Sequence, residues 1–390
     1  MDTKSISVGV FVPTGSAFEN ENERGLAHFV EHMLFKGTKS RSYKDIAEEM
    51  DRLGGTINAF TSKEYTCFYV KVLKDYADQG IDILQDIISS SLIDEKELNK
   101  EKGVIIEEIN MTQDNPDEAA FEHFMENAMP CNFGKPILGT RERINSYTRN
   151  DLVRFMGKYY QPENLIVSIV GKDKNVDFSF KNRFAFEDFF TDEKNTNIDF
   201  KFKSGTDVVK REIQQSNIVI GFELFDIYDE RKYAAYLLSD IFGGTMSSRL
   251  FQTIREEQSL CYHISSSVKF FRTGGLGAIF AGTYKDNTQK LLDSVKKEFE
   301  KLKKGYITKE ELSKAKTHFK GTYLLSLESP YAVMAKQGID NIFYGKYIDE
   351  NYIIEKIDSV TTDNIADLIN LIDIDKFHIT VLGDIDKIEW

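Results

Sequence analysis

The apolar positions in the first half of the chain change between the two-residue period of strands and the three- to four-residue period of helices. SISVGVFV, at 5–12, has the alternation and β-branching of a strand, whereas 26–35 has apolar residues at helical spacings. Gly54-Gly55 supplies the stop of a further helix. We expect strands at 5–12, 56–62, 65–73 and 164–171, and helices at 26–35, 43–53, 76–90 and 94–111.

The second half of the chain repeats the first. A shift of 207 residues places AAYLLSDIFGGT (234–245) on AHFVEHMLFKGT (27–38), and a shift of 214 residues places ITKEELSKAK (307–316) on IDEKELNKEK (93–102). Loop insertions account for the difference between the two shifts. We therefore expect two similar domains from an internal duplication. We place these domains at 1–185 and 206–390 with a linker at 186–205, and expect a last helix of the first domain within 172–206.

Composition limits the class of partner. The chain has 63 acidic and 50 basic residues, so its net charge of −13 disfavours nucleic acid and weakly favours basic peptides. Cys67, Cys131 and Cys261 lie far apart and are odd in number, which predicts buried thiols rather than disulfides or a cysteine zinc site. No window approaches the about 20 apolar residues of a membrane span, and the start lacks the basic region of a signal peptide. We expect a cytoplasmic protein without a membrane segment.

The helix at 26–35 carries the candidate chemistry. His28 and His32 are one turn apart, about 6 Å along the axis, so both imidazoles can reach one ion. A catalytic zinc ion has three protein ligands of nitrogen, oxygen or sulfur. Glu31 cannot easily share the ion with both histidines, which leaves it free to accept a proton from the attacking water. A structural histidine pair is the alternative, but the H-x-x-E-H order and the apolar flanks favour a metal.

The third ligand must come from another segment, and the acidic helix at 94–111 has the best candidates. Glu108 follows the apolar pair 104–105 by one turn, which places Glu108 near the buried side, whereas Glu107 points about 100° away. This pattern favours Glu108 over Glu107 without excluding Glu107. Glu101 lies two turns before Glu108 on one face and can hydrogen-bond a ligand or the water network, as partners of metal ligands usually do.

The second copy of the repeat lacks these candidate ligands. The positions that match His28, Glu31 and His32 are Ala235, Leu238 and Ser239, and those that match Glu101 and Glu108 are Ala315 and Thr322. The joint loss of five polar residues predicts one active and one inactive copy. The histidines outside the motif, which have no comparable neighbours and are expected to be structural or solvated, are His123, His263, His318 and His378.

On these motifs the chain resembles the inverted-zincin peptidases of the pitrilysin (M16) family, most closely the short chains related to mitochondrial processing peptidase and bacterial processing proteases. The resemblance runs through GSAFENENERGLAHFVEHMLFKGT, GGTINAFTSKEYT, EKGVIIEEINM, KPILGTRERINSYTRNDL, YYQPENLIVSIVG and SSRLFQTIREEQSLCY. It implies one zinc ion per chain, with His28, His32 and Glu108 as ligands. It also implies Glu31 as the general base and Glu101 as a carboxylate behind the ligands.

The resemblance also implies where a peptide binds. It assigns Asn58, Ala59 and Phe60 to a strand edge that pairs with the substrate, as in β-augmentation. It places Arg255 and Tyr262 against the substrate at the zinc site, where the Tyr262 hydroxyl can stabilise the oxyanion. Without the family, GGTMSSRL suggests a phosphate loop, but it lacks the spacing and lysine of that motif.

The family fold implies two α+β domains, each an antiparallel-type sheet covered by helices, that together form half of a clamshell. In longer members the arginine and tyrosine come from the opposite half. In a chain of this length that half must be another subunit, so we expect a homodimer whose sites are completed by the partner subunit. Family members have about one more strand before SISVGVFV, so we expect an incomplete first sheet from a truncated start.

These observations predict a zinc metalloendopeptidase that hydrolyses oligopeptides or presequence-like segments with Glu31 as the general base. The alternative is a non-catalytic peptide-binding or assembly subunit of the same fold. Members with that role tend to lose the ligand set, which this chain keeps. A hydrolase of another amide agrees with the metal motif but has no support in the INAFTS edge.

Overall fold

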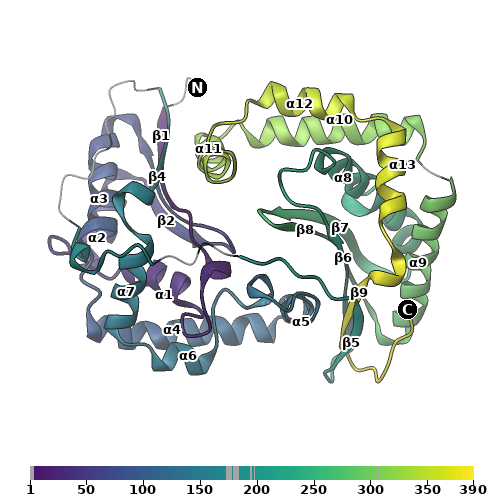
Figure 1. Cartoon of the computed structure of the whole chain (residues 1–390), viewed down its shortest axis with the longest axis horizontal. Coiled ribbons are helices and arrows are strands. Elements are labelled where there is room, and N and C mark those ends of the chain that lie inside the picture. Colours follow the sequence, from purple (N-terminus) through teal and green to yellow (C-terminus); the bar gives the residue numbers. More distant parts are fainter. Residues whose placement is uncertain (1–3, 173–177, 179–183, 194–195, 197, 306) are drawn as a thin grey trace. The chain divides into compact units, whose positions relative to one another are not determined.

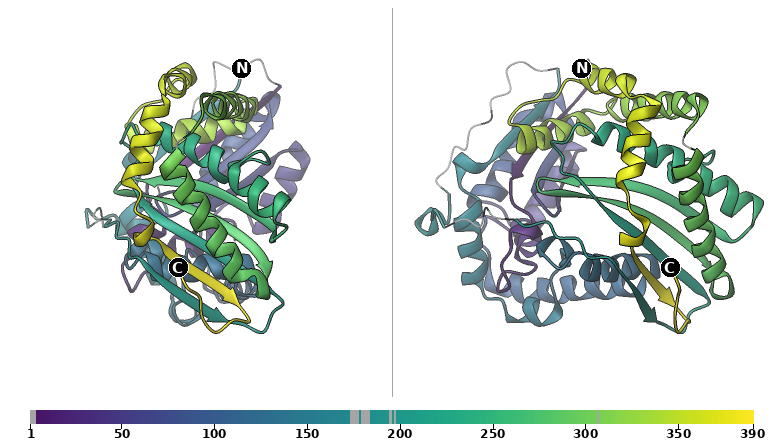
Figure 2. Two further views of the ribbon diagram at one scale, coloured as in Figure 1. Left: turned by 90° about the vertical axis from the view of Figure 1, so that its right-hand side faces the viewer. Right: turned by 45° about the vertical axis from the view of Figure 1, so that its right-hand side comes forward.

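The computed structural model describes residues 4–172, 178, 184–193, 196, 198–305 and 307–390. These residues form two compact units, each with a sheet and helices (Figures 1 and 2). Each unit has its own hydrophobic core. Unit 1 comprises Met1–Met111, Lys135–Ile198 and Ser326–Ile348, and unit 2 comprises Thr112–Gly134, Asp199–Leu325 and Asp349–Trp390. Within the described ranges, every helix is too short or too polar to span a bilayer.

Unit 1 is built on an antiparallel sheet with the strand order β2-β3-β1-β4. Its strands are β1 (Ser5–Val12), β2 (Thr56–Thr61), β3 (Thr66–Leu73) and β4 (Ile166–Val170). The central strand β1 is buried on both faces, since Val8 and Val10 pack into the helical core while Phe11 packs on the opposite side. The strand β2 lies at one edge of the sheet.

Helices cover the sheet of unit 1. On the face of Val8 lie α1 (Leu26–Leu34), α2 (Tyr43–Leu53), α3 (Ala77–Ser90), α4 (Glu95–Asp114), α6 (Arg141–Ser146) and α7 (Arg149–Tyr159). Local signals fix several of their ends. In α2, Ser42 and Asp45 form a capping box, and Gly54 ends the helix with φ of 60°. The four strands and four helices predicted between residues 5 and 171 are thus confirmed to within a few residues.

Unit 2 has the strand order β5-β9-β6-β8-β7, in which only the β5 and β9 pair is parallel. Its strands are β5 (Gly205–Lys210), β6 (Gln215–Leu224), β7 (Cys261–Phe271), β8 (Gly274–Tyr284) and β9 (His378–Gly383). The helices that bury its core are α8 (Lys232–Ser239), α9 (Thr288–Gly305), α10 (Lys309–Ser326), α12 (Glu350–Ser359) and α13 (Thr362–Leu371).

Each unit receives one helix from the other half of the sequence. In unit 1, α11 (Pro330–Tyr344) packs on β1 and β4, and the Ser168 hydroxyl donates to the Met334 carbonyl at 2.9 Å. In unit 2, α5 (Pro116–Ala128) packs on β9 and β6, with Phe124 edge-on to His378. The compact units therefore differ from the two continuous ranges 1–185 and 206–390 by this exchange, and the boundaries within the sequence stay a prediction.

The two units repeat one plan. Elements from β1 to β4 recur in the same order from β6 to β9, and the strand order β2-β3-β1-β4 matches β7-β8-β6-β9. The exchanged helices are equivalent, since the shift of 214 residues places Pro116 on Pro330, the first residue of each helix. The strand β5 has no counterpart among the described residues of unit 1. The predicted α+β scaffold of two similar domains is confirmed; the clamshell stays a prediction.

The helix expected within 172–206 is not formed in the described part of that stretch. Glu187–Phe189 forms a single 3-10 turn, and several other positions of the stretch lie outside the described residues. Phe184 and Phe186 are buried in the core of unit 1. The apolar residues that suggested a helix thus anchor an irregular segment, which also includes part of the predicted linker 186–205.

The close approach of α11 to the sheet gives a stability prediction. A Cβ atom at Gly338 would lie 2.1 Å from the ring of the buried Phe11, whereas a Cβ atom at Gly321 in α10 meets nothing within 4 Å. We expect Gly338→Ala to destabilise the protein by about 1–3 kcal/mol through overpacking. Gly321→Ala should stabilise it by about 0.5–1 kcal/mol through helix propensity. Urea unfolding midpoints that shift in the same direction for the two variants would contradict this packing.

Candidate metal centre

The helix α1 carries two histidines beside its buried apolar face. Phe29, Val30 and Met33 are fully buried in the core of unit 1, which fixes the rotation of the helix. His28 and His32 lie beside that apolar face, with side chains 13% and 17% exposed. Their rings lie 4.4 Å apart, centroid to centroid. The two predicted histidines are therefore close enough for both rings to bind one ion.

The first turn of α1 is held by a buried carboxylate. Glu19 is inaccessible to solvent, and its two oxygens accept hydrogen bonds from the backbone N–H groups of Gly25 at 2.9 Å and Ala27 at 2.8 Å. Burial raises the pKa of Glu19 to about 8, against the opposing effect of these N–H groups. Gly25 has φ of 87°, so the residue before the helix is itself in the left-handed region. Glu19 thus caps the helix that carries the histidines.

The third candidate ligand comes from α4. Oε2 of Glu108 lies 3.7 Å from Nε2 of His28 and 3.5 Å from Nε2 of His32. Three such ligand atoms, one from each residue, lie within 4.8 Å of one another. Atoms bound tetrahedrally to one zinc ion at about 2.0–2.1 Å would lie about 3.3 Å apart, close to these separations. Glu107 is exposed, so the structure favours Glu108 as the burial pattern does.

A second carboxylate on α4 lies behind His32. Oε2 of Glu101 lies 3.0 Å from Nδ1 of His32, and its other oxygen accepts from Nζ of Lys36 at 2.6 Å. Burial raises the pKa of Glu101, but these two partners outweigh it and lower the pKa below its usual value. An ionised Glu101 fixes Nδ1 of His32 as the protonated nitrogen and directs Nε2 toward Glu108.

The donor set fits a divalent metal ion. Burial, together with the neighbouring His32, lowers the pKa of His28 to about 3, so His28 is neutral and one of its ring nitrogens has a free electron pair for a metal ion. Nδ1 of His28 is buried without a hydrogen-bond partner among the described residues. Two imidazole nitrogens and one carboxylate oxygen form the ligand type of catalytic zinc sites. The group is also the one such cluster of histidine, cysteine and acidic residues found in the described chain.

Glu31 lies beside this group without being one of its members. Burial raises the pKa of Glu31. Its Oε2 accepts a hydrogen bond of 2.5 Å from the Thr61 hydroxyl at the end of β2. Glu31 is therefore a carboxylate beside the metal ligands that is oriented by the edge strand.

The predicted peptide edge is an edge strand. Asn58, Ala59 and Phe60 lie in the middle of β2, which pairs on one side with β3 and has no neighbour on its other side among the described strands. The Asn58 side chain accepts from the Ala59 N–H at 2.8 Å. The outer edge of β2 thus has no strand partner in the described sheet, which is the position where a further strand can add.

Arg255 and Tyr262 lie in unit 2. The Arg255 guanidinium lies over the Tyr262 ring at 5.5 Å and over the Phe251 ring at 4.4 Å. Arg255 is in a π-helix, Phe251–Glu257, and Tyr262 lies at a bulge in the edge strand β7 with 84% of the residue exposed. Such irregularities are frequent at functional sites. The structure brings the two residues together, and their role toward the metal stays a prediction.

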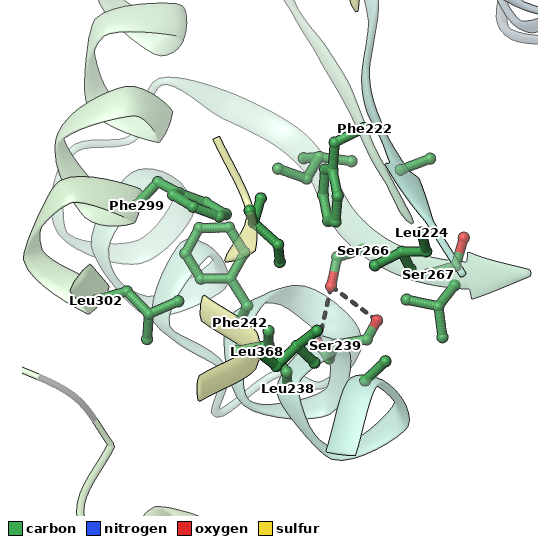
Figure 3. Close-up of a pocket in the computed structure, with 15 residues that line it drawn as sticks. Phe222, Leu224, Leu238, Ser239, Phe242, Ser266, Ser267, Phe299, Leu302 and Leu368 are labelled. Carbon is green, nitrogen blue, oxygen red and sulfur yellow. Dashed lines mark hydrogen bonds between the residues drawn. The ribbon is translucent and has the colours of Figure 1, made fainter. Parts of the chain in front are cut away.

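At the described positions that match the ligands of unit 1, unit 2 has other side chains. Ala235, Leu238 and Ser239 line a small apolar cavity of the unit 2 core, which Figure 3 shows among Phe222, Phe242 and Phe299. The Ser239 carbonyl accepts from the Ser266 hydroxyl at 2.8 Å (Figure 3). The positions that hold histidines in unit 1 thus hold packing residues in unit 2.

Family models match most of the chain. Residues 1–141 match "Insulinase (Peptidase family M16)", and residues 146–319 match "Peptidase M16 inactive domain". An uncharacterized zinc protease of Bacillus subtilis, YmxG, is 36% identical over 94% of this chain and 90% of its own length. The chain belongs to peptidase family M16. An uncharacterized zinc protease of Rickettsia felis is 35% identical over the same shares of both chains.

Solved structures agree with this M16 fold. A protease from Helicobacter pylori has a TM-score of 0.88 at 23% identity, covering 98% of this chain and 95% of its own. A Pseudomonas fluorescens structure titled as a peptidase M16 inactive domain has a TM-score of 0.87 at 18% identity, with coverage of 99% and 95%. At these identities the likeness concerns the fold alone.

Sequence reasoning missed three residues that support this M16 site: Glu19, Lys36 and Thr61. Lys36 was detectable from the sequence, because it lies one turn after His32 and its positive charge complements the negative charge of Glu101. Glu19 and Thr61 act from a loop and a strand end on a distant helix, and no local period reveals such contacts.

The ligand geometry predicts that two neighbouring glutamates of α4, Glu107 and Glu108, differ in their effect on Zn²⁺ affinity. Glu108→Gln should weaken Zn²⁺ binding to the metal-free protein by more than about 100-fold, beyond the 10–100-fold typical of residues behind the ligands. The exposed Glu107→Gln should bind like the wild type. Competition with a chromophoric chelator measures both constants. Equal affinities for the two variants would remove Glu108 from the site.

Proposed function

We propose that this chain is a zinc metalloendopeptidase with one zinc ion held by His28, His32 and Glu108. The observation that carries the proposal is the convergence of these three ligand atoms within 4.8 Å beside Glu31, a carboxylate outside the ligand group. Zinc, when bound, would supply Lewis-acid activation of water and of the scissile carbonyl. The names of the relatives, zinc proteases, support the same choice of metal.

Glu31 is the general base of the proposed reaction. It lies on the helical turn of the ligands but outside the ligand set, and burial favours proton uptake by its carboxylate. Glu31 accepts a proton from the attacking water and passes it to the leaving amine. Glu101 and Lys36 hold His32 in one tautomer during these steps.

The proposed substrate is an extended oligopeptide or presequence-like segment. The free edge of β2 at Asn58–Phe60 offers main-chain hydrogen bonds to any extended chain, and Thr61 connects this strand to Glu31. Arg255 and Tyr262 contact the substrate in this proposal, and the exposed Tyr262 hydroxyl stabilises the oxyanion. The net charge of −13 favours basic peptides. A cytoplasmic location stays a prediction from the sequence.

The proposed assembly is a homodimer in which Arg255 and Tyr262 of one chain complete the site of the other. Each chain has both the metal ligands and the Arg255 and Tyr262 pair, so two identical chains contain all parts of two sites.

If Glu31 is the general base, its substitution should abolish cleavage without affecting the binding of zinc or peptide. Glu31→Gln should retain zinc and peptide binding but lose cleavage by at least about 100-fold, because an amide cannot accept the proton. The exposed Glu48→Gln on α2 is the matched control and should cleave like the wild type. Quenched fluorescent peptides, with zinc content measured in parallel, provide the test. Wild-type cleavage by Glu31→Gln would contradict the assignment.

The dimer predicts complementation between inactive chains. Mixing His28→Ala with Tyr262→Phe under conditions of subunit exchange creates dimers with one intact site, built from the zinc site of one chain and Tyr262 of the other. We expect about a quarter of wild-type activity for a statistical mixture. Activity that stays at the level of the separate variants, despite proven exchange, would show that the parts act within one chain.

A further inference from the structure

Thr61 connects the edge strand to Glu31 through a short hydrogen bond. Its hydroxyl donates to Oε2 of Glu31 at 2.5 Å, and Thr61 is the last residue of β2, paired with Thr66 of β3. The bond joins residues 30 positions apart in the sequence and lies in partly buried surroundings. A hydrogen bond to a charged acceptor in such a place is stronger than one between neutral groups.

The strand end that carries Thr61 is rigidly supported. The following turn is closed by the Ser62 N–H, which donates to the Tyr65 carbonyl at 2.8 Å. The buried segment 15–19 then holds this turn, because the N–H groups of Ser16 and Ala17 donate to the Ser62 and Lys63 carbonyls. These two hydrogen bonds bring the backbone of the segment into close contact with the backbone of the turn.

Glycine is required where this segment meets the turn. A Cβ atom at Gly15 would lie 2.1 Å from the Ser62 carbonyl oxygen.

The same segment also holds the helix of Glu31. Glu19, at the end of 15–19, accepts from the N–H groups of Gly25 and Ala27 at the start of α1. One buried stretch of five residues therefore fixes both the donor strand and the acceptor helix. The distance between Thr61 and Glu31 is set by backbone contacts on both sides, rather than by two side chains that meet on a flexible surface.

We propose that Thr61 is a positioning residue that holds the Glu31 carboxylate in its reactive orientation and connects it to the strand that pairs with the substrate. This inference rests on the proposed function. The Thr61 hydrogen bond occupies Oε2 and leaves Oε1 of Glu31 as the oxygen that takes the proton from water. Threonine suits this task, because its β-branched side chain has few rotamers in a strand and its single proton is committed to Glu31.

The activity test compares two substitutions of Thr61. Thr61→Val keeps the shape but removes the donor, and should lower kcat by about 10- to 100-fold with KM and zinc content unchanged. Thr61→Ser keeps the donor and should stay within about threefold of the wild type. Thr206→Val, at an exposed threonine of β5, is the control and should match the wild type. Equal loss in Thr61→Val and Thr61→Ser, or none in either, would overturn the inference.

A second readout does not depend on activity. Urea unfolding of the metal-free protein is measured for Thr61→Val, Glu31→Ala and the double variant. Removing the donor should lower the midpoint by on the order of 0.3 M when Glu31 is present and leave it unchanged when Ala occupies position 31. Additive shifts would overturn the inference. A chain that cleaves no peptide but shows the coupling would contradict the proposed function while leaving the contact between Thr61 and Glu31 established.

Discussion

The candidate metal site of unit 1 depends on keeping two imidazoles and a carboxylate within a few ångströms of one another. Such polar groups do not gather by themselves, because each loses hydration when it is buried. The apolar faces of α1 and α4 bring them together by packing into one core, which includes Phe29, Met33, Ile105 and Ile109. Polar contacts then fix the details. Glu19 holds the start of α1, and Glu101 with Lys36 holds the ring of His32.

The duplicated scaffold shows which of these features belong to the fold and which to the chemistry. Strand order, helix order and the exchanged helices α5 and α11 are common to both units. The ligands are not, since Ala235, Leu238 and Ser239 serve the packing of unit 2 at the matching positions. The fold therefore stands without a metal donor set, and the donor set of unit 1 is a local addition to a stable plan.

Much of the fold could be predicted from the sequence, because each helix and strand reveals itself in the regular spacing of its apolar residues. The apolar stripe of α1 placed His28 and His32 on one side. The stripe of α4 favoured Glu108 over the exposed Glu107, and the family resemblance chose between them. The helix exchange could not be predicted, since a helical pattern does not say which sheet covers its apolar face. The contact between Thr61 and Glu31 was equally hidden, because it depends on a turn held by a distant loop. The π-helix at Arg255 and the bulge at Tyr262 break the periods on which sequence reading relies.

Peptide hydrolysis by this chain, as proposed, requires one metal ion held by unit 1. The most direct test of this requirement is to strip the protein of metal with a chelator and return Zn²⁺ in steps while following the cleavage of a peptide. We expect no cleavage at the start, and a linear rise in rate that ends at one equivalent of Zn²⁺ per chain. Cleavage by the metal-free protein, or none after a full equivalent is bound, would contradict it.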